Sequence, residues 1–163
     1  MYVITGVGPR CGTSFVMHSL VEEGIPYKGE RFPAWTVKEE NPNGYYEIDP
    51  VKHHDGIQHN DWKDHVVKLW PHVLSKTPPE YIQKIVILER IDKKTQFNSM
   101  IRLKQKEEKH NNVSFGMVDD SKIIPKSKEL IYSYLDTNLI PTIKVYTEEL
   151  DKQIDVIKLF IKE

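Results

Sequence analysis

The N-terminal segment constrains the fold of this chain more than any other. Residues 2–6 form an apolar run typical of a buried strand, and residues 7–12 form a loop rich in Gly and Pro. Residues 13–23 have the apolar spacing of an amphipathic helix, which Gly24 ends. A strand that passes through such a loop into a helix forms an anion site, because loop amides and the positive end of the helix dipole converge there.

The loop also carries a cation and two hydroxyls. Arg10 places a permanent positive charge inside it, and Thr13 and Ser14 stand at the start of the helix. The lysine that grips phosphates in P-loop nucleoside triphosphatases is missing, because Thr13 directly precedes Ser14. We therefore expect a phosphate-bearing ligand, but not ordinary hydrolysis of a nucleoside triphosphate.

The rest of the chain alternates between strand-like and helix-like segments. Further strands are predicted at residues 65–69, 84–88 and 141–146. Helices are predicted at residues 49–60, 92–109, 121–137 and 148–161, and a long loop at residues 28–47. This order predicts an α/β fold of P-loop nucleotide-binding type, with three α/β/α layers around a central parallel sheet, in a single domain spanning residues 1–163. The anion loop then lies at the carboxyl edge of the sheet, where such sheets bind ligands.

Composition excludes several classes of function. The net charge of −1 gives no electrostatic footprint for nucleic acid, and no apolar run is long enough to span a bilayer. We therefore expect neither a nucleic-acid partner nor a membrane partner. The chain begins with a strand rather than with a basic region and an apolar stretch, so we expect no secretory signal and a cytoplasmic location. Cys11 is the single cysteine, which excludes an internal disulfide framework.

Four segments, taken in order, resemble a known family. Residues 9–14 are similar to the phosphosulfate-binding loop of sulfotransferases that use 3′-phosphoadenosine 5′-phosphosulfate. Residues 41–47 resemble the Asn-Pro-x-Gly-Tyr/Phe-x-Glu segment of the family's short bacterial and phage-type members. Residues 84–99 resemble its strand that ends in Arg before a helix bearing Ser, and residues 146–150 resemble its Tyr-Glu-Asp-Leu segment.

The resemblance implies which residues hold the donor, 3′-phosphoadenosine 5′-phosphosulfate. Its 5′-phosphosulfate would lie on one run of the loop: Arg10, Cys11, Gly12, Thr13 and Ser14. Arg90, at the end of the third strand, would grip the 3′-phosphate with its planar fork. Ser99 would join it, although the usual family spacing lands one residue earlier, on Asn98. Tyr146 would stack near the adenine.

The resemblance also implies catalytic roles. Arg10 would stabilise the charge that grows on the bridging oxygen and the sulfuryl group, and Lys68 would face that group from the end of the second strand. Some members place a His base two residues after this Lys, where this chain has Trp70. Four residues are therefore candidates for the base: His72, His53, His54 and Glu47. Of these, we assign His72 to the catalytic group, together with Arg10 and Lys68.

These inferences predict a sulfotransferase that needs no metal and acts on a hydroxyl or amine of a small molecule, glycan or peptide. Three aromatic residues of the long loop are candidates for the wall of the acceptor pocket: Trp35, Tyr45 and Tyr46. Two other functions stay open. One is a kinase with a degenerate loop, which would need Mg²⁺ and a lysine on the phosphates. The other is a non-catalytic nucleotide-binding module, favoured because no Arg-Lys-Gly segment follows the last helix of this sequence.

Overall fold

The centre of the molecule is a five-stranded parallel sheet. A computed structural model describes residues 1–34, 36–111 and 120–163. The strands are β1 (Tyr2–Gly6), β2 (Tyr27–Lys28), β3 (Val66–Lys68), β4 (Lys84–Glu89) and β5 (Thr142–Tyr146). Their order in the sheet is β2-β3-β1-β4-β5, and each neighbouring pair is parallel. The parallel α/β architecture predicted from the sequence is therefore confirmed.

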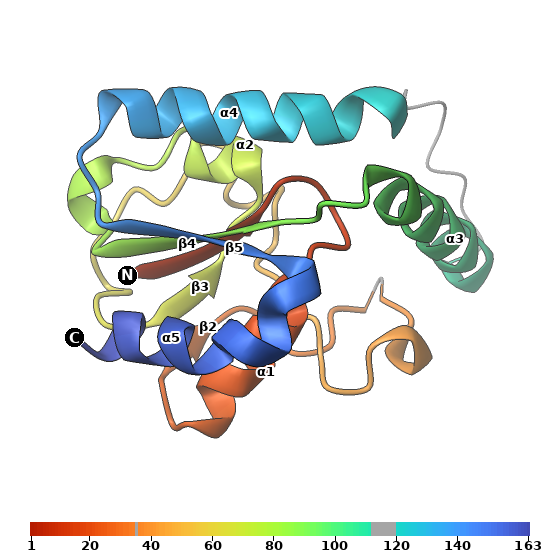
Figure 1. Ribbon diagram of the computed structural model, residues 1–163, viewed down its shortest axis with the longest axis horizontal. Coiled ribbons are helices and arrows are strands. Elements are labelled where there is room, and N and C mark those ends of the chain that lie inside the picture. The colour runs from red at the N-terminus through yellow and green to blue at the C-terminus, as the bar shows by residue number, and fades with distance from the viewer. Residues whose placement is uncertain (35, 112–119) are drawn as a thin grey trace.

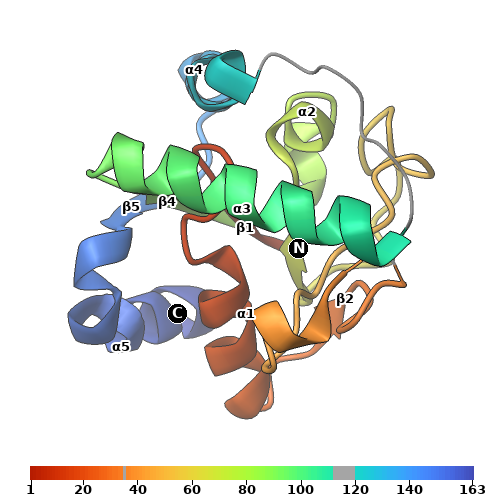
Figure 2. The same ribbon diagram turned by 90° about the vertical axis from the view of Figure 1, so that its right-hand side faces the viewer.

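Helices cover both faces of the sheet (Figure 1). One face packs against α2 (Pro71–Leu74) and α4 (Ile123–Thr137), and the other against α1 (Thr13–Glu22) and α5 (Leu150–Lys162). The remaining α-helix of the described residues, α3 (Lys93–Asn111), lies beyond the ends of the strands and crosses in front of β1 in the view of Figure 2. It therefore covers the edge at which β1 leads into the anion loop. None of the described helices is both long and apolar enough to cross a bilayer.

Alternation along the buried strands divides the core into two layers. Towards α2 and α4, the sheet contributes Val3, Val67, Ile85 and Ile87, which meet Val73, Leu74, Ile131 and Tyr134. Towards α1 and α5, it contributes Ile4, Val66, Val86 and Leu88, which meet Val16, Leu20, Ile157 and Ile161. Burial on both faces explains why the strands are continuous apolar runs rather than alternating ones.

The helix predicted at residues 49–60 is wrong. Residues 50–55 form turns instead of a helix. The Asp49 carboxylate caps the first of them, because its Oδ1 accepts hydrogen bonds from the amides of Val51 and Lys52. The chain then turns at Gly56, where φ is +84° and a Cβ would lie 2.5 Å from the carbonyl carbon of Lys76. A helix cannot continue through that position, because the backbone there must adopt a left-handed conformation beside another segment.

The prediction of four strands also missed short elements. β2 has only two residues and pairs with β3, so no apolar period marks it. α2 was not predicted either, because it is a single turn that begins at Pro71. In the described residues, the remaining short elements are four 3₁₀ turns: η1 (Lys38–Glu40), η2 (Pro79–Tyr81), η3 (Asp120–Lys122) and η4 (Thr147–Glu149).

Candidate functional site

The loop between β1 and α1 has the backbone geometry of an anion site. Its φ angle is positive at every second residue: 83° at Gly8, 66° at Arg10 and 84° at Gly12. Such alternation turns successive amides towards one concave side. Within the described part of the chain, the amides of residues 10–15 donate to no backbone carbonyl. The positive φ of Arg10 costs on the order of 1 kcal/mol, so the fold holds this residue in an unfavourable conformation at the site.

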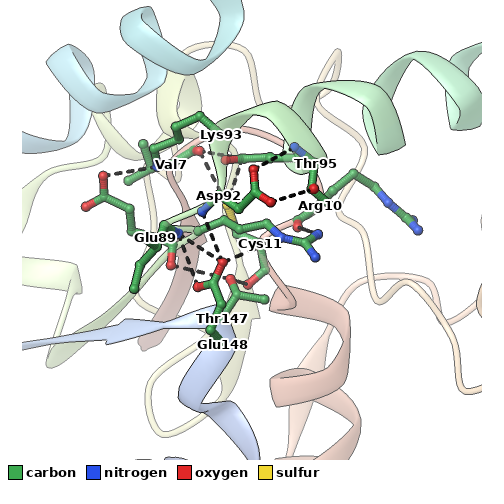
Figure 3. Close-up of polar contacts among 12 residues, drawn as sticks. Val7, Arg10, Cys11, Glu89, Asp92, Lys93, Thr95, Thr147 and Glu148 are labelled. Carbon is green, nitrogen blue, oxygen red and sulfur yellow. Dashed lines mark hydrogen bonds and ion pairs between the residues drawn. The ribbon is translucent and has the colours of Figure 1, made fainter.

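Two side chains from other elements hold the loop in this shape. Gln96 of α3 is fully buried, and its Nε2 donates to the carbonyl oxygens of Val7 at 2.9 Å and Pro9 at 2.8 Å. Thr147 Oγ1, which precedes α5, donates to the Cys11 carbonyl oxygen at 2.8 Å (Figure 3). The loop is thus fixed from both sides before any ligand binds, which lowers the entropic cost of binding.

The Cys11 side chain is a buried part of the loop and bonds to the loop backbone. It is fully buried, and its thiol donates to the Val7 carbonyl oxygen at 3.3 Å. Burial raises the pKa of the thiol to about 11, although Lys93 and Arg90 lower it slightly. The reactive thiolate is therefore rare at neutral pH.

We expect Cys11 to resist alkylation in the folded protein. At pH 8, iodoacetamide is expected to modify the native thiol at least about 100-fold more slowly than the urea-unfolded one, because the raised pKa alone lowers the thiolate fraction by about that factor. Mass spectrometry after timed quenching measures both rates. Equal rates in the two states would contradict the buried position of this side chain.

Arg10 contacts Ser99 through its side chain and Arg90 through its backbone carbonyl. Arg10 Nε donates to Ser99 Oγ at 3.0 Å, and Arg90 Nη1 donates to the Arg10 carbonyl oxygen at 3.4 Å. Arg90 Nε lies 3.8 Å from a carboxylate oxygen of Glu148. The same carboxylate accepts hydrogen bonds from the amides of Ile91 and Asp92, which precede α3 (Figure 3). Ser99 is 9% exposed and faces the loop, whereas Asn98 is exposed on α3. The structure therefore brings Ser99, and not Asn98, to Arg10.

Lys68 reaches the loop from the end of β3. Its Nζ donates to Ser14 Oγ and to the Tyr45 carbonyl oxygen, each at 3.1 Å, and forms an ion pair with the Glu47 carboxylate. The side chains of Lys68 and Glu47 are only 13% and 7% exposed. Their charges are therefore weakly screened by water, and the ammonium group is fixed beside the first turn of α1.

A cavity of about 810 Å³ opens over the loop. Among the described residues, its charged lining consists of five basic side chains, Arg10, Lys68, Arg90, Lys104 and Lys126, and three acidic ones, Glu40, Glu47 and Glu107. The excess of positive charge favours an anionic ligand. An apolar wall completes the cavity, formed mainly by Phe15, Trp70, Met100, Leu103, Ile123 and Leu130. The cavity thus has a cationic floor at the loop and an apolar wall from α3 and α4.

Most of the residues predicted for the site line this cavity: Arg10, Gly12, Thr13, Ser14, Lys68, His72 and Arg90. Cys11 and Ser99 do not line the cavity. Cys11 bonds to the Val7 carbonyl oxygen within the loop, and Ser99 accepts a hydrogen bond from Arg10. Tyr146 also lies outside the lining, and its ring packs on Lys144, with Nζ 4.9 Å from the ring centroid. Stacking of Tyr146 on an adenine therefore stays a prediction.

The candidates for the acceptor wall and the base are spread over the molecule. Tyr45 lines the cavity, whereas Tyr46 is buried in the core beside His18, and Trp35 lies outside the described residues. His53 packs on Trp62, and His54 pairs with Asp55 on the surface. Only two of the four candidates for the base thus line the cavity, His72 and Glu47. Burial, with Lys76 and Lys126 nearby, lowers the pKa of His72 and favours its neutral form.

Glu107 lines the cavity, although the sequence interpretation did not select it. It stands in the charged second half of α3, a region typical of a solvated helix face. Burial raises the pKa of its carboxyl to about 7, with a further contribution from Glu47 that Arg10 opposes. The spacing of Met100, Leu103, Lys104 and Glu107 along one helix face is the signal that could have found it.

Comparison of the chain with models of protein families, with curated proteins and with solved structures gives no match. Among the residues that the structure describes, no group of three or more His, Cys, Asp or Glu side chains could hold a metal ion. The function must therefore be argued from the geometry and chemistry of the site.

Proposed function

We propose that this protein is a sulfotransferase that moves a sulfuryl group from 3′-phosphoadenosine 5′-phosphosulfate to a hydroxyl or amine of an acceptor. The observation that carries the proposal is the pair of adjacent anion sites joined by Arg10. One is the amide-lined loop beside Lys68, and the other is the contact of Arg90 and Ser99 with Arg10. A ligand with two separate anionic groups fits such a pair, and the proposed donor has a phosphosulfate and a 3′-phosphate.

The roles follow from charge and position. In the proposal, the loop amides and the hydroxyls of Thr13 and Ser14 bind the phosphosulfate, while Arg90 and Ser99 bind the 3′-phosphate. Arg10 and Lys68 stabilise the negative charge that develops as the bond between sulfur and the bridging oxygen breaks. Fixed cations and amides need no reorganisation during the reaction, so positioning and electrostatics supply most of the catalysis. The nucleotide-binding site would then be of P-loop type.

The position of Lys68 also favours a second function, phosphoryl transfer. Its Nζ lies 3.1 Å from Ser14 Oγ and could replace the lysine that the loop itself lacks. A kinase also needs carboxylates or hydroxyls that bind Mg²⁺ with the phosphates. Glu47 is paired with Lys68 and Glu40 with Lys106, so two of the three acids in the cavity lining are already engaged by lysines. This arrangement supports the sulfuryl donor over a magnesium–nucleotide complex.

Binding of adenosine 3′,5′-bisphosphate, measured by titration calorimetry, tests the proposal. We expect saturable binding to the wild type and a roughly 10- to 100-fold loss of affinity in Arg10→Ala, because a charge-assisted contact to phosphate is removed. Arg102→Ala is the matched control, since this exposed arginine of α3 lies outside the cavity lining. It should bind like the wild type.

The same titration separates the alternatives. If the wild type fails to bind the bisphosphate, or if Arg10→Ala binds it equally well, the proposal is wrong. Tighter binding of ATP with Mg²⁺ than of the bisphosphate would favour a kinase. Adenosine 5′-monophosphate should bind more weakly than the bisphosphate to the wild type, and Arg90→Ala should remove most of that difference.

A further inference from the structure

The stretch of α3 that lines the cavity begins just after Ser99 and includes Glu107. Ser99 contacts Arg10, and Glu107 stands eight residues further along the helix. A rise of about 1.5 Å per residue separates them by about 12 Å along the axis. Met100, Leu103 and Lys104 line the cavity between them. Since the proposed 3′-phosphate site lies at Ser99, Glu107 stands at the opposite, acceptor end.

The second half of α3 is fastened to the far wall of the cavity. Lys106, next to Glu107, forms an ion pair with Glu40 of η1. η1 lies below the C-terminal half of α3 in Figure 2, so this contact joins the helix to the segment that leads to Tyr45. Glu107 is therefore held over the cavity by its neighbour and does not depend on its own carboxylate for its position.

The carboxylate of Glu107 differs from the other two acids of the cavity. Within the described part of the chain, it forms no hydrogen bond and no ion pair, whereas Glu47 and Glu40 are each paired with a lysine. Its side chain is half-buried, and the charges of Glu47 and Arg10 act on it with opposite signs. It is thus an acid in the cavity lining that has an oxygen available for a ligand.

We propose that Glu107 is the catalytic base of the sulfuryl transfer and accepts the proton of the acceptor hydroxyl. This inference rests on the proposed function. The acceptor oxygen forms a bond to sulfur, the bond from sulfur to the bridging oxygen breaks, and adenosine 3′,5′-bisphosphate leaves with that electron pair. The proton moves from the acceptor oxygen to the Glu107 carboxylate and later to solvent. The acceptor lies against Met100 and Leu103, between the base and the loop.

The other two candidates in the cavity suit this role less well. Glu47 holds Lys68, and taking up a proton would break a buried ion pair. His72, at the start of α2, lies near Lys76 and Lys126, whose charges oppose the uptake of a proton by its ring. The pKa of Glu107, raised to about 7 chiefly by burial, lies in the range in which a carboxylate is an efficient base at neutral pH. Among the described residues, the other charged and titratable groups of the lining are Arg10, Glu40, Tyr45, Glu47, Lys68, His72, Arg90, Lys104 and Lys126.

The test uses sulfur-labelled donor with two acceptors, para-nitrophenol and water, in multiple- and single-turnover assays. Glu107→Gln should lower kcat for transfer to para-nitrophenol by about 100-fold or more, as expected when a general base is removed. It should lower the rate at which water hydrolyses the bound donor by a similar factor. The wild-type rate should rise with pH with an inflection near 7, and this rise should be absent in Glu107→Gln. Affinity for the bisphosphate should stay within about threefold of the wild type, because the base lies away from both phosphate sites.

Glu108→Gln is the matched control, because Glu108 is the neighbouring acid on α3 and lies outside the cavity lining. It should keep the rate and the pH profile of the wild type. If Glu107→Gln keeps them as well, or if His72→Asn alone removes the pH-dependent rise, the inference is wrong. It is also wrong if the wild type binds the bisphosphate but consumes bound donor no faster than buffer does. Failure of bisphosphate binding would instead overturn the proposed function.

Discussion

Lys68→Met is expected to destabilise the protein by about 3–5 kcal/mol at pH 7, because it leaves the buried Glu47 carboxylate without its cation. Lys68 Nζ contacts Glu47, Ser14 and the Tyr45 carbonyl oxygen, and the other carboxylate oxygen of Glu47 has no hydrogen-bond partner in the described residues. The Met side chain keeps most of the volume, so the loss reflects charge rather than packing. Urea unfolding followed by circular dichroism measures it.

A double variant shows whether the pair is the cause. Adding Glu47→Gln to Lys68→Met removes the unpaired charge and should recover much of the lost free energy of unfolding. A cost below about 1 kcal/mol for Lys68→Met, or a double variant no more stable than the single one, would show that the two charges contribute little.

The elements that the sequence predicted correctly are those with a strong apolar signal of their own. β1, β4 and β5 are largely apolar runs of five or six residues, long enough to be predicted as strands from the sequence. Their alternation with helices predicts a parallel sheet. β2 consists of two residues that become a strand only because they pair with β3. The region around Asp49 has the cap of a helix without the apolar face that would continue it, and Gly56 ends it.

The site was predictable where residues adjoin in the sequence and less so where helices bring them together. The loop residues 10–14 are contiguous, so one motif places them all. Ser99 and Asn98 differ by one position on α3, and only the rotation of that helix decides that Ser99 meets Arg10. Glu107 was missed for the same reason. The sequence of a charged helix gives the charged residues, but it does not give which of them face a cavity and become partly buried.

The second large effect is expected at Glu89, the last residue of β4. Its side chain is 6% exposed, and its carboxylate lies 3.2 Å from Lys93 Nζ, 3.2 Å from Lys128 Nζ and 2.9 Å from Lys144 Nζ. It therefore joins α3, α4 and β5 at the edge that carries the cavity. Burial pulls the pKa of this carboxyl upwards, but the hydrogen bonds of the three lysines outweigh burial and hold the pKa at about 2.

Glu89→Gln should lower the free energy of unfolding by about 2–3 kcal/mol at pH 7, somewhat less than the pKa difference implies because the lysines are partly exposed. A pKa below the unfolded value means that the stabilisation is present above about pH 4.5 and disappears as the pH falls towards 2. Urea unfolding should therefore show a difference between wild type and variant that is, at pH 3, roughly half or less of its value at pH 7. Glu23→Gln removes two exposed ion pairs, to Lys158 and Lys162, and should change stability far less. A constant difference at both pH values would mean that the amide disturbs packing and that the charge of Glu89 does not hold α3 and α4 around the cavity.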